Sequence, residues 1–143
     1  MVVNEILAIV EKENLADFIY VFFCEAGYFS AENTEWILKA SNKYGLIPKI
    51  HVNQFTTIGG IKIAVDNNAL SVDHLEVMAD EDFDILKDSN CIPTLLPSCS
   101  FFLGIPYAPA KKMIDKDLLG KVTTRKQLLT YLEQHKNEDS RFQ

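Results

Sequence analysis

The sequence lacks the features of several large classes of protein. Its 14 basic residues are outnumbered by 20 acidic ones, and the resulting net charge of −6 argues against a surface that binds nucleic acid. Its longest strongly apolar run, Phe18 to Cys24, is far too short to cross a bilayer. The first residues, Met1 to Glu5, do not combine a basic region with an apolar core, as a secretory signal does. We therefore expect a cytoplasmic protein that binds small molecules or other protein surfaces, and neither nucleic acid nor a membrane.

Cysteine and histidine are also scarce. The chain has three cysteines, Cys24, Cys91 and Cys99, without a Cys-x-x-Cys pair or a Cys/His spacing typical of structural zinc. An odd number of separated cysteines favours reduced thiols over a disulfide framework. The composition, 48% hydrophobic and 24% charged over 143 residues, is that of one globular domain with enough length to bury a core.

Short apolar runs alternate with amphipathic segments along the first 115 residues. The runs at 16–24, 47–52, 71–77 and 92–96 are expected to be strands. Each precedes an expected helix: one capped by Ser30 and ending at Lys43, one from near Thr57, one capped by Asp80, and one over 110–115. Strand-plus-helix units in series predict an α/β fold with a parallel sheet.

The pattern changes after Asp115. Residues 116–120 contain no clear apolar strand, and Val122 alone is a poor seed for one. Thr124 is a candidate cap for a polar amphipathic helix, which includes His135 as a surface residue. We therefore expect residues 116–143 to form a helical tail that is partly frayed at its end.

Two histidines close neighbouring strands of the expected sheet. His51 ends the strand at 47–52, and His74 lies near the end of the next one. Adjacent parallel strands point the same way, so the two imidazoles are expected side by side at one end of the sheet, where (β/α) barrels place their chemistry. His51 is then either a metal ligand or a half-buried histidine that bonds to a loop carbonyl.

Other polar residues near these strand ends have two interpretations each. Gln54 follows His51 by three residues and either orients a substrate amide or bonds to the loop backbone. Asp73 should point away from His74 because side chains alternate along a strand, whereas Glu76 is a candidate for orienting the His74 ring. Glu25 is expected to be a surface carboxylate.

The glycine pair Gly59-Gly60 opens an expected helix. Free backbone N–H groups at such a position can bind an anion. The pair lacks the spacing of the dinucleotide-binding and Walker motifs, so we interpret it as a site of tight packing.

Several blocks in order give the chain a specific resemblance to imidazolonepropionase, a family of the amidohydrolase superfamily. The matching blocks include His51 to Phe55, Ala69 to Glu76, Leu95 to Leu103 and Pro106 to Asp115. The resemblance covers roughly residues 1–115 and implies a partial TIM-type (β/α)₈ barrel, formed by strands four to seven, followed by the divergent tail at 116–143. The implied activity is the hydrolysis of 4-imidazolone-5-propanoate to N-formimidoyl-L-glutamate in histidine degradation, with one zinc or iron ion.

The resemblance also implies roles for individual residues. His51 matches the metal ligand of the fifth strand, and His74 matches the sixth-strand histidine that holds the attacking water and the developing oxyanion. Gln54 stands where the family's usual His-Ala-Asp-Glu-Phe block has a substrate-contacting Glu, which favours substrate binding over proton transfer.

Two motifs of the family have no counterpart in this sequence. The His-x-His pair of the first strand is absent, and Leu118 to Thr124 stands in place of the metal-binding Thr-Asp-Phe-Asn-Pro-Gly segment. We therefore expect zinc or iron binding to be weak or absent in this chain alone, and the chain alone to be inactive. The alternative is a non-catalytic partial barrel that serves as a binding or assembly module. For either function, we expect the open sheet edges to promote homo-oligomers.

Overall fold

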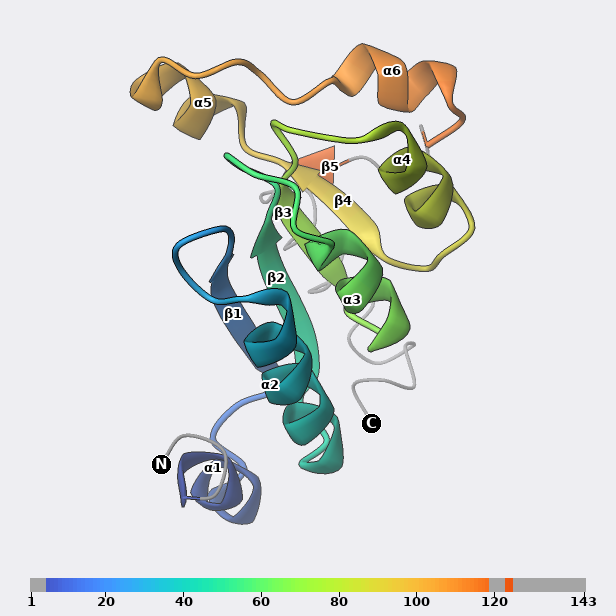
Figure 1. The fold of residues 1–143 in the computed structure, drawn as a ribbon. Coiled ribbons are helices and arrows are strands. Elements are labelled where there is room, and N and C mark those ends of the chain that lie inside the picture. Colours follow the sequence, from blue (N-terminus) through green and yellow to red (C-terminus); the bar gives the residue numbers. More distant parts are fainter. Residues whose placement is uncertain (1–4, 119–122, 125–143) are drawn as a thin grey trace.

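The computed structural model describes residues 5–118, 123 and 124 (Figure 1). Each strand pairs in parallel with the next along the chain. In sheet order the strands are β1 (Phe18–Cys24), β2 (Ile47–Val52), β3 (Ser71–His74), β4 (Ile92–Leu95) and β5 (Thr123–Thr124). The predicted α/β fold with a parallel sheet is confirmed.

Helices alternate with the strands. They are α1 (Leu7–Glu13), α2 (Ala31–Lys43), α3 (Gly60–Asp66), α4 (Asp80–Lys87), α5 (Pro97–Leu103) and α6 (Ala110–Asp115). Figure 1 shows α2, α3 and α4 along one face of the sheet, with α5 and α6 beyond the carboxyl ends of the strands. None of the helices in the described residues has the length and apolar character needed to span a membrane.

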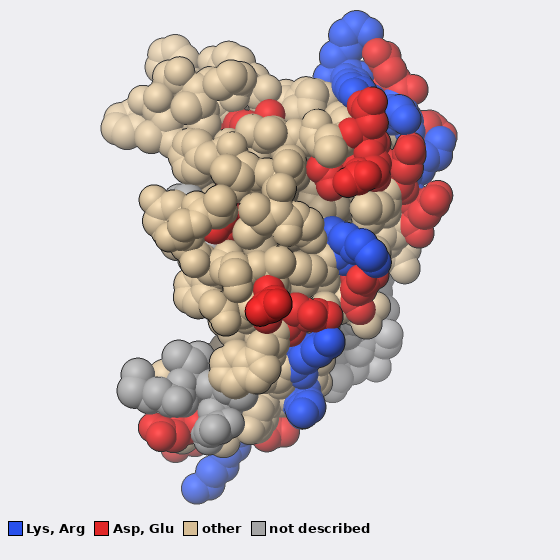
Figure 2. All heavy atoms as spheres, in the orientation of Figure 1, with Lys and Arg blue, Asp and Glu red and all other residues tan. Residues whose placement is uncertain are grey.

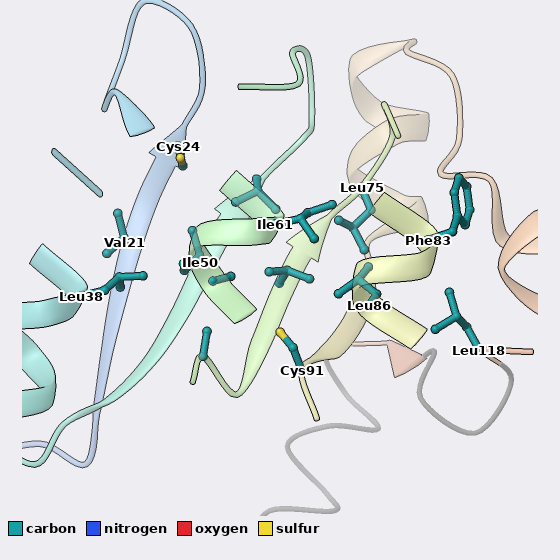
Figure 3. Packing of buried hydrophobic residues seen from close by; sticks show 14 of the residues in the cluster. Val21, Cys24, Leu38, Ile50, Ile61, Leu75, Phe83, Leu86, Cys91 and Leu118 are labelled. Atoms are coloured by element: carbon teal, nitrogen blue, oxygen red, sulfur yellow. The ribbon is translucent and has the colours of Figure 1, made fainter. Parts of the chain in front are cut away.

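The main core lies between the sheet and the helices α2, α3 and α4 (Figure 3). Its strand residues include Val21 and Ile50, which face helix residues such as Leu38 and Ile61. Gly60 begins α3 where the helix touches the sheet: a Cβ at this position would lie 2.8 Å from a methyl carbon of Val52. Only glycine fits such an approach, so tight packing is confirmed for Gly60, whereas Gly59 has open space around it and a φ of 85° that favours glycine.

Helix α2 begins as predicted, and its single tryptophan lies outside its buried face. The Ser30 side chain accepts a hydrogen bond from the Asn33 backbone N–H at 3.2 Å, which is an N-cap. Trp36, however, is exposed, and the buried face includes Thr34, Leu38 and Ser41. These positions are three and four residues apart, so they form one stripe along the helix, and Trp36 lies off it.

The third strand is shorter than predicted. It ends at His74 rather than at residue 77, because His74 and Leu75 have φ angles of 90° and 68°, which interrupt the extended backbone. Asp80 is the first residue of α4 and does not cap it. The cap comes from the Asp82 side chain, which accepts a hydrogen bond from the Ala79 backbone N–H at 2.9 Å.

The chain returns to the sheet after α6, which the sequence did not indicate. Leu118 is fully buried in the main core, and Thr123–Thr124 pairs with Thr94 and Leu95 of β4. The expectation of no strand after Asp115 was therefore wrong, since this strand forms by pairing with β4 and not through apolar residues of its own. The predicted tail helix, including His135, lies outside the described residues, and the division at residue 115 stays a prediction.

Helix α6 is attached to α4 by charge and by apolar burial. Lys112 forms an ion pair with Asp80, and Lys116 forms one with Asp84 at 3.1 Å. Met113, on the same helix as Lys112, is fully buried in the main core. The polar and apolar contacts together place α6 against the rest of the domain.

Candidate functional site

The two strand-end histidines are in contact. The ring centroids of His51 and His74 lie 3.9 Å apart, with 42° between the ring planes. His51 is 2% exposed and His74 is 7% exposed. The predicted proximity of the two imidazoles is therefore confirmed, while their chemical roles stay predictions.

The strand register alone would not bring these rings together. His51 pairs with Asp73, and Val52 pairs with His74, so regular alternation would place the two imidazoles on opposite faces of the sheet. The positive φ angles of His74 and Leu75 break that alternation. Such angles cost about 1–3 kcal/mol per residue for non-glycine residues, and they often accompany functional sites. We infer that this bend turns the His74 ring toward His51.

Glu76 and Ser100 lie beside His74. One carboxylate oxygen of Glu76, Oε1, lies 3.4 Å from His74 Nδ1 and accepts a hydrogen bond from Ser100 Oγ at 2.7 Å. Burial raises the pKa of Glu76, but hydrogen bonds from His74 and Ser100 outweigh it, so this pKa lies below its ordinary value. Glu76 therefore contacts the His74 ring, while its role in orienting that ring stays a prediction.

The environment of His51 favours a neutral ring. Burial and, next, the neighbouring His74 lower the pKa of His51 to about 4, although Glu76 and the Gln54 side chain act in the opposite direction. Phe22 packs its ring edge-on against the imidazole, with centroids 5.3 Å apart. A neutral imidazole is the form that accepts a proton or binds a metal ion.

The backbone of the loop after β2 is held by Glu25, whose importance sequence reasoning missed. Glu25 is 1% exposed, so the expectation of a surface carboxylate was wrong. It accepts hydrogen bonds from the backbone N–H groups of Gln54 at 2.5 Å, Phe55 at 3.4 Å and Thr56 at 2.8 Å. The Thr56 hydroxyl also donates to Glu25 and accepts from the Ala26 N–H at 3.0 Å.

The Gln54 side chain is buried at the same end of the sheet. Its Nε2 lies 3.5 Å from Cys99 Sγ on α5, and the side chain is close enough to His51 to raise the pKa of that imidazole. The structure thus brings Gln54 together with both histidines and Glu76, from β2, β3 and the loops that follow them. An acidic residue directly after a buried strand was the one signal for Glu25, because that position meets the loop of the neighbouring parallel strand.

Asp73 pairs with His51 in the strand register and so shares its face of the sheet, while the bend at His74 removes the alternation on which the predicted separation of Asp73 and His74 rested. Asp73 accepts hydrogen bonds from the Tyr20 hydroxyl at 3.1 Å and from the Ser71 hydroxyl at 3.2 Å. The partner Tyr20 lies on the neighbouring part of the sheet, in β1. Asp73 therefore links strands on the face of the sheet that His51 occupies.

The described residues do not form a complete metal site. Among residues 5–118, 123 and 124, no group of three His, Cys, Asp or Glu side chains is arranged to hold a metal ion. A catalytic zinc ion ordinarily has three protein ligands, and the described part of the chain offers His51 without such a set. The expected ion therefore does not fit these residues alone.

Comparison with known proteins connects the sequence to a family of enzymes. No protein-family model matches the chain. It is 57% identical over 118 residues to the imidazolonepropionase of Christiangramia forsetii and 60% identical over 114 residues to that of Flavobacterium psychrophilum. It is 41% identical over 117 residues to that of Thermoanaerobacter pseudethanolicus. These matches cover 80–82% of this chain, and the chain spans 28% of the length of each relative.

Proposed function

Because this chain resembles imidazolonepropionases over 82% of its length while spanning 28% of theirs, we propose that it supplies one part of a site that hydrolyses a cyclic amide. The substrate class follows the name of the relatives: 4-imidazolone-5-propanoate, opened to N-formimidoyl-L-glutamate in histidine degradation. The observation that carries the proposal is the contact between the His51 and His74 rings, whose centroids lie 3.9 Å apart at the carboxyl end of a parallel sheet.

The chemistry asked of these residues is simple in outline. Water adds to the ring carbonyl carbon, the ring C–N bond breaks, and the departing nitrogen takes up a proton. His74 accepts the proton of the attacking water and stabilises the developing oxyanion. Gln54 holds the ring through its amide, since a carboxamide donates and accepts hydrogen bonds without changing its protonation.

The zinc or iron ion of the proposal needs ligands beyond the described residues. His51 would be one ligand, and a bound ion would supply Lewis-acid polarisation of the amide carbonyl. With one imidazole in place of a set of three ligands, we expect the purified chain to bind the ion weakly. Isothermal titration with Zn²⁺ and with Fe²⁺ should show no stoichiometric sub-micromolar binding. Tight binding that is lost in His51→Ala would contradict this expectation.

Substrate binding tests the proposed function directly. The isotope-labelled chain is titrated with 4-imidazolone-5-propanoate, and the amide and side-chain NMR signals are followed. We expect the shifts to concentrate on Gln54 and His74. In Gln54→Ala we expect the affinity, followed through the His74 signals, to fall at least several-fold. Asn90→Ala is the matched control, because Asn90 is exposed and precedes β4, at the other end of the sheet. Unchanged Gln54 and His74 signals would refute the proposal.

A turnover assay separates binding from catalysis. We expect no formation of N-formimidoyl-L-glutamate by the purified chain, since the described residues hold no complete metal site. Turnover that rises with the square of protein concentration would mean that a second protomer completes the ligand set.

The alternative function, a non-catalytic module for binding or assembly, is favoured by the surface. Figure 2 shows charged residues gathered on one side of the molecule and few on the side that includes α5. On α5, Phe101 is 77% exposed and Phe102 is 86% exposed. Strand β1 lies at the edge of the described sheet, and open edges promote association. We expect sedimentation to show a homo-oligomer; a compact monomer would count against this alternative.

A further inference from the structure

A buried carboxylate beside the histidines belongs to Glu76. Its side chain is 1% exposed, and it lies between two elements that are distant in sequence. On one side is His74 at the end of β3, whose Nδ1 lies 3.4 Å from Glu76 Oε1. On the other side is the buried Ser100 of α5, whose hydroxyl donates to the same oxygen at 2.7 Å and to the backbone carbonyl of Leu96 at 3.4 Å.

This arrangement distinguishes the two nitrogens of the His74 ring. An ionised carboxylate only accepts hydrogen bonds, so the nitrogen that faces it must carry a proton. The contact is made by Nδ1, which leaves the lone pair of a neutral ring on Nε2. The ring nitrogen able to accept a proton from water is therefore fixed by Glu76.

The local backbone explains why such a contact is needed. His74 and Leu75 have positive φ angles of 90° and 68°, so the His74 ring stands on a strained bend and not on a regular strand. Strained conformations persist when surrounding contacts hold them. The bend is held by hydrogen bonds from the Leu75 N–H to Val52 at 3.3 Å and from the Val77 N–H to Asn53 at 2.8 Å. These bonds fix the backbone and leave the ring orientation to Glu76.

We propose that Glu76, anchored by Ser100, is the positioning residue that sets the orientation and the tautomer of His74. The proposal rests on the proposed function for its purpose, because a fixed Nε2 lone pair matters when His74 receives a proton from water. Its physical content, the location of one proton, is independent of substrate and of metal.

The test is a nitrogen NMR spectrum of the whole chain labelled with ¹⁵N-histidine, recorded with a chelator at about pH 8, where a free histidine is neutral. The His74 signals are assigned from their loss in His74→Gln. In the unmodified chain we expect the proton on Nδ1. In Glu76→Ala we expect the proton to move to Nε2 or to be shared between the two nitrogens. Glu76→Gln retains a carbonyl acceptor and should keep the proton on Nδ1.

Glu32→Ala is the matched control, since it removes an exposed glutamate from α2 and should leave the His74 signals unchanged. A proton on Nε2 in the unmodified chain would overturn the proposal, and this result does not depend on whether Glu76→Ala folds. An unchanged His74 tautomer in a folded Glu76→Ala variant would overturn it as well. Neither result bears on the proposed function, which is tested by substrate titration.

Discussion

Replacement of Glu25 by alanine should be among the most damaging single changes at the carboxyl end of the sheet. The carboxylate accepts hydrogen bonds from three consecutive backbone N–H groups, those of Gln54, Phe55 and Thr56, and from the Thr56 hydroxyl. The change removes both carboxylate oxygens at once and leaves these donors without their acceptor. The loop that carries Gln54 would lose its fixed position.

The magnitude follows from the number and kind of these bonds. A hydrogen bond to a charged group contributes about 1.5–3 kcal/mol, and buried donors left without acceptors carry a further cost. The contributions are not additive, and water replaces some of them at the partly exposed Phe55 and Thr56. We expect Glu25→Ala to lower the free energy of unfolding by about 3–5 kcal/mol. That is a large part of the roughly 5–15 kcal/mol that stabilises a typical domain.

Urea unfolding followed by circular dichroism measures this effect. The midpoint should fall while the m-value stays constant, which identifies a change in stability and not in compactness. Glu25→Gln should be intermediate, because it keeps an acceptor but turns an amide N–H toward a backbone donor. The exposed Glu32 serves as the control, and its alanine variant should change stability by less than about 0.5 kcal/mol. A loss below about 1 kcal/mol in Glu25→Ala would refute the reasoning.

Three further predictions concern packing, pH and thiol chemistry. Gly60→Ala should lower the free energy of unfolding, measured in urea, by about 1–3 kcal/mol, because its Cβ would lie 2.8 Å from a Val52 methyl carbon. An unchanged free energy of unfolding would mean that α3 shifts freely. The lowered pKa of His51 means that the unfolded chain binds the proton more readily than the folded one. In the presence of a chelator, the neutral His51 should therefore contribute fully to the free energy of unfolding above about pH 6.5. This contribution, about 3 kcal/mol in total, should be lost as the pH falls through about 4. His51→Gln should remove that part of the pH dependence, and parallel curves would contradict the assignment. Cys99, which is partly exposed, should react with a disulfide reagent well before Cys24, whose pKa is raised by burial; equal rates would show that the β1 end opens readily.

Local signals in the sequence were sufficient for much of the fold. The strand Ile47–Val52 and the helix Ala110–Asp115 have the predicted bounds, and Ser30 caps α2. These elements are defined by apolar runs, by helix-capping residues and by prolines, which act over a few residues. The order of parallel strands also predicted that His51 and His74 lie at one edge of the sheet, whereas the contact of their rings depends on the bend at His74.

The remainder depends on contacts between distant segments. The burial of Glu25 results from donors 29 to 31 residues further along the chain. The buried strand before Glu25 indicates that it lies at the edge of the sheet, but it does not identify these donors. The strand Thr123–Thr124 forms because β4 offers a pairing edge. The bend at His74 is visible as two positive φ angles, which residues other than glycine seldom adopt, so sequence rules predicted a longer strand there.

The attachment of α6 to α4 has a consequence for how the domain comes apart. The ion pairs of Lys112 and Lys116 are exposed, so added salt weakens them, whereas the burial of Met113 and Leu118 is insensitive to screening. Concentrated salt should then leave the segment from α6 to Leu118 packed against the domain. Heat should release this segment together with the sheet, in one cooperative transition. Limited proteolysis after residue 109 should accordingly begin only when the whole domain unfolds, because this segment does not detach by itself.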